Sequence, residues 1–139
     1  CKGNSVLRLI HYPPVQDKSN ILRARAHEDI NLITLLVGAE ESGLEVQNRD
    51  GDWVPIEAKS KSIVCNIGDM MQLVTRSQLK STTHRVIDNK AGSSSSRYSM
   101  PFFLHPSPEV ELCSIVDNST ESISAHDFLE ARLKAIKLY

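Results

Sequence analysis

The chain contains little cysteine, which limits the frameworks that could stabilise it. Its 139 residues include 3 cysteines, Cys1, Cys65 and Cys113, and no two of them form a C-x-x-C pair. A disulfide framework or a structural zinc site needs more cysteines at closer spacing. We therefore expect reduced thiols and a cytoplasmic location.

An excess of charge and a long apolar run are also missing. The sequence has 16 Lys and Arg against 17 Asp and Glu, a formal net charge of -1 at pH 7. This balance gives no reason to expect a nucleic-acid or membrane partner. No apolar run approaches the ~20 residues of a membrane-spanning helix, and the first residues do not resemble a signal peptide. We expect a soluble chain.

Short apolar segments separated by turn-forming residues make up most of the sequence, a pattern typical of β-strands. The length predicts a single domain over residues 1–139. The predicted strands are residues 6–11, 31–37, 44–47, 53–56, 62–66, 71–75, 84–88, 97–105 and 110–115.

Turn and helix signals divide these strands. Residues 48–52 contain Asp50-Gly51, which suits a tight hairpin, and the Gly/Ser-rich residues 89–96 predict a flexible hairpin tip. Ser124 can cap a helix at about residues 124–138, with Asp127 three residues later. The fold class is therefore all-β with a C-terminal helix, as two facing antiparallel sheets in a jelly roll or related barrel.

His27, Asp29 and His84 carry the most informative chemistry. Residues two apart in a strand share a side, so His27 and Asp29 can face inward while Glu28 points away. His84 opens another apolar segment, which a rolled sheet could bring opposite. Two imidazoles and a carboxylate suit Fe(II) and leave coordination positions open. Because the chain has 5 histidines, a structural role for this set is the simpler alternative.

Arg97 and Ser99 add a second feature to this set. They are also two apart, so on a strand their side chains face the same way. A guanidinium binds a carboxylate through two parallel hydrogen bonds, and a neighbouring hydroxyl can donate a third. A surface ion pair would explain Arg97 alone, but the combination favours an organic acid as ligand.

Several motifs together resemble the Fe(II)- and 2-oxoglutarate-dependent dioxygenases of the isopenicillin N synthase-like branch. The resemblance covers about residues 9–106. The motifs, in chain order, are His11-Tyr12-Pro13-Pro14, His27-x-Asp29, Gly68-Asp69-Met70-Met71, His84-Arg85-Val86 and Arg97-Tyr98-Ser99-Met100-Pro101.

The resemblance implies a double-stranded β-helix, which is a jelly-roll barrel with the metal inside. It implies that His27, Asp29 and His84 bind Fe(II) and act in catalysis. By the same resemblance, Arg97 and Ser99 hold the distal carboxylate of 2-oxoglutarate, and Tyr12 lines the co-substrate or substrate pocket. The implied activity uses O2 and 2-oxoglutarate to hydroxylate or desaturate a small organic molecule, releasing succinate and CO2.

Three alternatives stay open. Isopenicillin N synthase and aminocyclopropane-carboxylate oxidase lack a 2-oxoglutarate requirement and take electrons from substrate or ascorbate, although they share Arg-x-Ser. A second alternative is a cupin-like jelly-roll binding module without oxygenase activity. Cupins usually have a His-x-His pair, and this sequence lacks one, which argues against that alternative. The third is an inactive remnant, because we expect the N-terminal region of larger family members to be absent from this chain.

Other residues receive structural interpretations. We expect Gly68-Asp69 to form a turn between strands and His105 to lie at the surface. His11 and His126 have no partner at ligand spacing, so we expect them to be structural or solvent-exposed.

Overall fold

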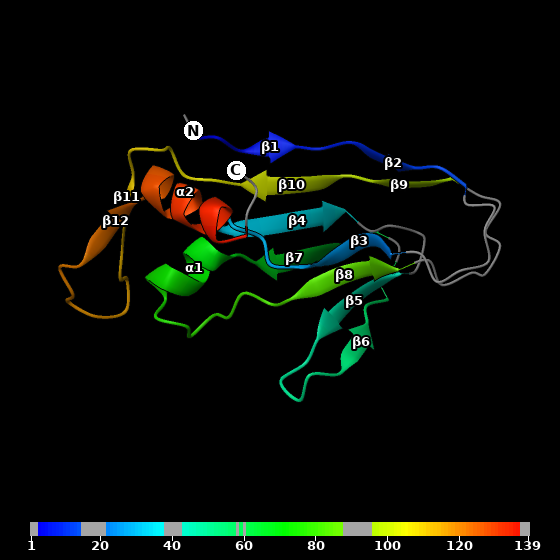
Figure 1. Cartoon of the computed structure of the whole chain (residues 1–139), viewed down its shortest axis with the longest axis horizontal. Coiled ribbons are helices and arrows are strands. Elements are labelled where there is room, and N and C mark those ends of the chain that lie inside the picture. The colour runs from blue at the N-terminus through cyan, green and yellow to red at the C-terminus, as the bar shows by residue number, and fades with distance from the viewer. Residues whose placement is uncertain are drawn as a thin grey trace.

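Two four-stranded antiparallel sheets form the body of the molecule (Figure 1), a computed structural model that describes residues 3–14, 22–37, 43–57, 59, 61–87 and 96–136. The first sheet has the order β1 (Val6–Leu7), β10 (Pro101–Leu104), β4 (Ile33–Val37) and β7 (Ile63–Ile67). The second has the order β3 (Leu22–His27), β8 (His84–Ile87), β5 (Leu44–Gln47) and β6 (Trp53–Pro55).

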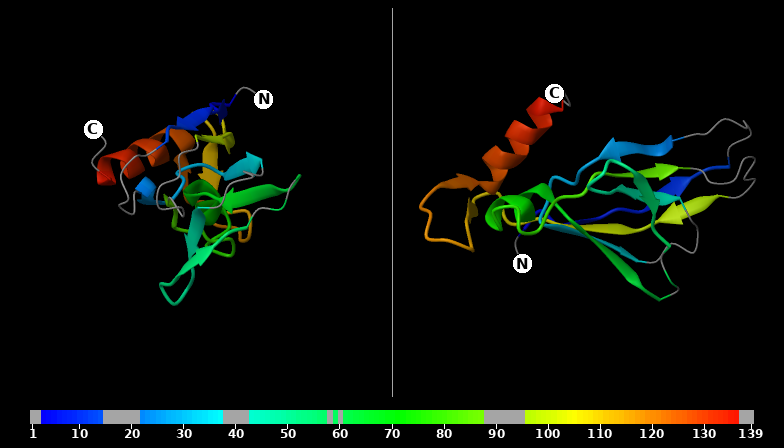
Figure 2. Two further views of the ribbon diagram at one scale, coloured as in Figure 1. Left: turned by 90° about the vertical axis from the view of Figure 1, so that its right-hand side faces the viewer. Right: turned by 90° about the horizontal axis from the view of Figure 1, so that it is seen from below.

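The remaining elements are two strand pairs and two helices. The strand pairs are β2 (Ile10–Tyr12) with β9 (Arg97–Ser99) and β11 (Glu111–Cys113) with β12 (Ser122–Ser124), and the helices are α1 (Asp69–Val74) and α2 (Ala125–Ala135). Figure 2 shows both helices and the β11–β12 pair at one end of the sheets. The predicted mainly-β fold with a C-terminal helix is confirmed. No helix in the described part of the chain is long and apolar enough to cross a membrane.

Alternation along the strands gives the first sheet two different faces. Phe103, Thr34 and Asn66 are cross-strand partners, and all three line the space between the two sheets. Their neighbours Phe102, Leu35 and Cys65 form the next row and so point to the opposite face. The inner face therefore mixes polar and apolar side chains, as a binding cavity requires.

The buried hydrophobic cluster lies outside the sheets, where the helices meet β11. It consists of Met70, Val74, Leu112 and Ala125, and Met70 is only 1% exposed. Helix α2 begins where the sequence predicts, because the Ser124 side chain accepts a hydrogen bond from the Asp127 amide at 3.0 Å. This cluster fixes α1 and α2 against the loops that lead into the sheets.

One predicted strand, residues 71–75, is wrong, because these residues belong to helix α1 and its C-cap. Met70 and Val74 are both buried and four residues apart, which is the spacing of a helix face rather than a strand. Gly68 is the N-cap of this helix, so the predicted turn between two strands is also wrong. Strands β3 and β12 were not predicted, and the stretch 97–105 is divided at Met100 into β9 and β10.

The predicted hairpin at residues 48–52 is confirmed. The Asn48 side chain accepts hydrogen bonds from the amides of Asp50 and Asp52, and Gly51 has a φ of 90°, which glycine adopts without steric cost. It joins β5 to β6, which pair antiparallel. Of the second predicted tip, residues 89–95 lie outside the described residues.

Candidate functional site

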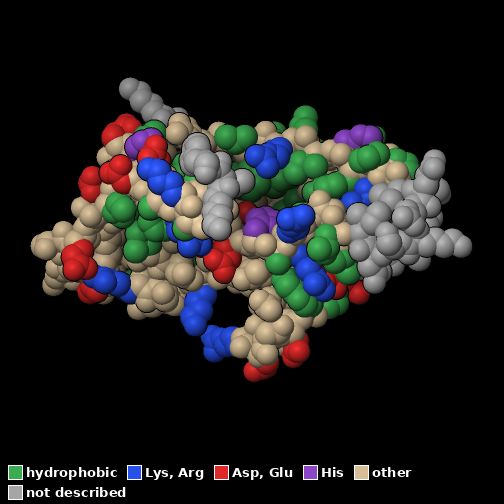
Figure 3. Space-filling view, in the orientation of Figure 1, with side chains coloured by type: hydrophobic (Ala, Val, Ile, Leu, Met, Phe, Trp, Pro, Cys, Tyr) green, Lys and Arg blue, Asp and Glu red, His purple; other side chains and the backbone are tan. Residues whose placement is uncertain are grey.

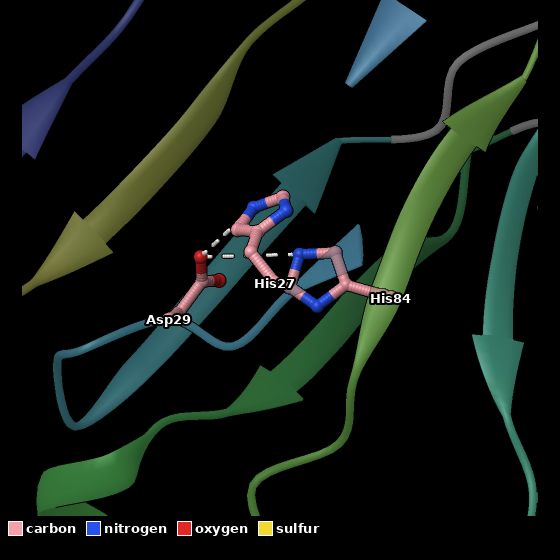
Figure 4. A group of neighbouring side chains, drawn as sticks. All are labelled: His27, Asp29 and His84. Atoms are coloured by element: carbon pink, nitrogen blue, oxygen red, sulfur yellow. Dashed lines mark ion pairs between the residues drawn. The ribbon is translucent and has the colours of Figure 1, made fainter. Parts of the chain in front are cut away.

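The structure brings His27, Asp29 and His84 together between the sheets. His27 ends β3, His84 begins β8, and the two are cross-strand partners. The Asp29 Oδ1 atom lies 3.7 Å from His27 Nε2 and 3.9 Å from His84 Nε2 (Figure 4). One ligand atom from each residue lies within 4.8 Å of the others. Asp29 lies beyond the end of β3, so the loop, and not strand alternation, directs its carboxylate inward.

Backbone carbonyls orient both imidazoles. His27 Nδ1 is 2.6 Å from the Arg25 carbonyl oxygen, and His84 Nδ1 is 3.1 Å from that of Thr82. A carbonyl only accepts, so each Nδ1 can donate to it, and a neutral ring held in this way has its unprotonated Nε2 on the side of Asp29. Two neutral imidazole nitrogens and a carboxylate oxygen on one side of an ion are a donor set that fits Fe(II).

The other carboxylate oxygen of Asp29 is held by a buried hydrogen-bond chain that the sequence did not predict. Asn31 Nδ2 donates to Thr34 Oγ1 at 2.8 Å, and Thr34 Oγ1 donates to Asp29 Oδ2 at 2.5 Å. All three side chains are buried. Thr34 is the one polar residue of the otherwise apolar strand β4, and that was the signal in the sequence that could have identified it.

A cavity of about 180 Å³ extends from the three residues between the sheets. Its polar lining includes Ser99, Tyr12 and Arg8, and its apolar walls are formed by Ile10, Ala24, Leu36, Leu44, Val86, Pro101 and Phe103. The hollow near the centre of Figure 3 likewise has hydrophobic side chains inside it, with a histidine and basic side chains at its edge. Such walls exclude water while leaving a few polar groups to orient a ligand.

Arg97 and Ser99 alternate with Tyr98 as the sequence predicts. Arg97 is 6% exposed, Tyr98 is 67% exposed, and Ser99 lines the cavity. Tyr12 is the cross-strand partner of Arg97, and the Arg97 Cζ atom lies 5.7 Å from the centroid of the Tyr12 ring. Strands β2 and β9 therefore bring all three residues to the same region.

His105 differs from its prediction. It is partly buried rather than a surface residue, and this burial lowers the pKa of its imidazole, while the nearby Asp29 carboxylate raises it to a smaller extent. The backbone of His105 is held beside the residue that precedes β1. The Ser5 hydroxyl donates to the His105 carbonyl oxygen at 3.3 Å and accepts from the His105 amide at 3.2 Å.

The other two histidines are placed as predicted. His11 is exposed and stacks on Tyr98 with ring centroids 4.8 Å apart. His126 is exposed on α2, and its Nε2 atom lies 3.5 Å from Glu130 Oε1. Neither belongs to the group around Asp29.

Comparison with known proteins gives a consistent result. Residues 3–106 match the 2OG-Fe(II) oxygenase superfamily. A 2-oxoglutarate-dependent dioxygenase of Didymella fabae is 42% identical over 111 residues, which are 76% of this chain and 33% of that protein. The chain thus spans about a third of the length of this curated relative.

Solved structures show the same fold. A 2OG-Fe(II) oxygenase family protein of Caulobacter crescentus is 48% identical with a TM-score of 0.86, over 96% of this chain and 46% of that one. A full-length Neurospora crassa protein in complex with alpha-KG is 28% identical with a TM-score of 0.84, over 95% and 45%. The sheets are therefore those of a double-stranded β-helix. On the extent of these matches, the chain belongs to the 2OG-Fe(II) oxygenase superfamily.

Proposed function

We propose that this chain is the catalytic core of an Fe(II)- and 2-oxoglutarate-dependent dioxygenase that hydroxylates or desaturates a small organic molecule. Succinate and CO2 are the co-products. The observation that carries the proposal is the convergence of His27 Nε2, His84 Nε2 and Asp29 Oδ1 at the wall of a largely apolar cavity. Membership of the superfamily and the alpha-KG complexes of its solved relatives support it.

In this proposal His27, Asp29 and His84 hold the iron. When bound, the iron supplies the one-electron chemistry that activates dioxygen. The carbonyls of Arg25 and Thr82 keep both imidazoles in the tautomer that can bind a cation. Thr34 keeps the Asp29 carboxylate from rotating, so Oδ1 faces the imidazoles.

Arg97 and Ser99 anchor the distal carboxylate of 2-oxoglutarate. Arg97 supplies the positive charge and a planar pair of donors, and Ser99 supplies a hydroxyl donor. The Tyr12 ring packs near the guanidinium and limits its rotation. The apolar walls strengthen these polar contacts because they exclude competing water.

The substrate class is a small molecule that fits between the sheets. The related Neurospora crassa protein has been solved with alpha-KG and thymine, which supports a compact substrate of this kind for a related cavity. Arg8 and Tyr12 add polar groups to the cavity lining beside the metal residues. A cytoplasmic location stays a prediction of the sequence.

Oxygen consumption by the complete protein tests the proposal. With Fe(II) and a panel of small organic acids and heterocycles, oxygen uptake should require 2-oxoglutarate and yield equal amounts of succinate and CO2. Turnover that continues without 2-oxoglutarate would favour an oxidase of the isopenicillin N synthase or aminocyclopropane-carboxylate oxidase type. Iron binding without any turnover would favour a cupin-like module or an inactive remnant.

A further inference from the structure

Arg132 of helix α2 contacts two carboxylates beside the metal residues. Its Nε and Nη2 atoms lie 2.8 Å and 2.7 Å from Asp69 Oδ2, and Nη2 also lies 3.4 Å from Glu28 Oε2. Glu28 belongs to the loop after β3 and Asp69 begins α1. One guanidinium therefore links the C-terminal helix to both segments.

Glu28 connects this cation to all three metal residues. It stands between His27 and Asp29 in the sequence, and its Oε1 atom accepts a 2.9 Å hydrogen bond from Thr83 Oγ1. Thr83 directly precedes His84. The Oε1 atom of Glu28 thus joins the loop after β3 to the start of β8, and its Oε2 atom joins the same loop to α2. Glu28 does not line the cavity.

Asp69 connects the same cation to the Asp29 loop through the backbone. Its side chain is 5% exposed, and its amide donates a 2.8 Å hydrogen bond to the Asp29 carbonyl oxygen. The two neighbouring amides also donate to this loop. The Gly68 amide donates to the Leu32 carbonyl oxygen and the Met70 amide to the Asn31 carbonyl oxygen, each at 2.9 Å. The first turn of α1 therefore holds the loop that carries Asp29.

We propose that Arg132 is a positioning residue of the metal centre, an inference that rests on the proposed function. A buried carboxylate such as Asp69 is costly without a cation, so Arg132 stabilises the place of α1 and, through its amides, the Asp29 loop. The guanidinium bonds both Glu28 and Asp69, and its single positive charge offsets part of their combined negative charge. Glu28 is thereby held from two sides, by Arg132 and by Thr83. A lysine presents one compact charge and cannot reproduce this planar contact with two carboxylates.

Anaerobic titration of the complete protein with Fe(II), monitored by calorimetry, tests this role. Arg132→Gln should weaken Fe(II) binding about tenfold or more, the range typical for residues that orient metal ligands. Arg132→Lys should recover part of the loss. Lys134→Gln is the matched control, because the exposed Lys134 lies on the same helix. Within the described part of the chain its ion pair is with the partly exposed Glu130, at 3.0 Å. Its Fe(II) affinity should equal that of the parent.

Thermal unfolding of the metal-free variants separates positioning from simple stabilisation. If Arg132→Gln lowers the melting temperature but the folded protein binds Fe(II) with parental affinity, the inference is overturned and the proposed function stands. If the parent protein itself binds no Fe(II), both the inference about Arg132 and the proposed function are wrong. Should Arg132→Gln not fold, Glu28→Gln tests the same link: weaker binding supports the inference, and parental affinity overturns it.

Discussion

Thr34 Oγ1 lies 2.5 Å from Asp29 Oδ2, and the direction of this hydrogen bond is fixed by a third residue. Asn31 donates its amide proton to the same hydroxyl, which leaves the single hydroxyl proton of Thr34 for the Asp29 carboxylate. Because this bond holds Oδ2, the Oδ1 atom stays directed at the two imidazoles. The carboxylate is thus preorganised for a cation by two uncharged side chains.

Thr34→Val should weaken Fe(II) binding by about tenfold, because the isosteric side chain removes the hydroxyl that donates to Oδ2 of this carboxylate. Thr34→Ser keeps a hydroxyl at this position and should retain most of the affinity. Anaerobic Fe(II) titration of both variants measures the difference. Equal affinities of the valine and serine variants would show that the hydrogen bond does not orient the ligand.

Arg97→Ala should raise the concentration of 2-oxoglutarate needed for half-maximal activity, and Fe(II) affinity should change little. The loss of hydrogen bonds to a charged carboxylate costs about 1.5–3 kcal/mol each, so an effect of about tenfold to a hundredfold is expected. Arg97→Lys should fall between parent and alanine variant, since it keeps the charge without the fork. An unchanged requirement in Arg97→Ala would locate the anchor elsewhere.

Gly68→Ala should destabilise the fold and disturb the site together. A Cβ at this position would overlap both the side-chain Oδ1 atom and the carbonyl oxygen of Asn31. Forced displacement of a packed neighbour costs about 1–3 kcal/mol, and here the neighbour is the residue that donates to Thr34. Chemical denaturation measures the loss of stability, and Fe(II) titration measures the effect on the site.

Gly51→Ala is the control for this substitution. Gly51 has a φ of 90° and no atom within 4 Å of its added Cβ, so only backbone strain of about 1 kcal/mol is expected. Its hairpin tip projects away from the body of the two sheets beyond β5 and β6 (Figure 1), and Gly51 does not line the cavity, so Fe(II) affinity should stay at the parental value. If Gly68→Ala were as stable as the parent, the contact between Gly68 and the Asn31 loop could open without a loss of stability, which would contradict the prediction for Gly68→Ala.

Local chemistry made the candidate site predictable. His27 and Asp29 are two residues apart, and Arg97 and Ser99 share a strand face. Imidazole and carboxylate groups are ligands that suit Fe(II). The Ser124 cap was predictable for the same reason, since its partner is three residues away. These pairs depend on spacing that the chain itself fixes, whereas the inward direction of the Asp29 carboxylate comes from the loop after β3 and not from strand alternation.

Features that depend on packing were missed. The Arg132–Asp69 pair joins residues 63 positions apart, and nothing local indicates it. Residues 71–75 form a short apolar run, which fits a strand as well as a buried helix turn. Strand β3 escaped prediction because its sequence, Leu-Arg-Ala-Arg-Ala-His, has small and basic residues where a strong apolar alternation would be expected. The partial burial of His105 likewise depends on the packing of a distant segment.

The central claim is that Asp29 and the two histidines form an iron centre, and Asp29→Ala tests it most directly. Anaerobic Fe(II) titration of the complete protein should show one tight site, and Asp29→Ala should lose at least about a hundredfold in affinity, since it removes a ligand rather than a supporting contact. His126→Ala, which alters an exposed histidine on α2, should bind like the parent. Parental Fe(II) affinity in Asp29→Ala would contradict the account.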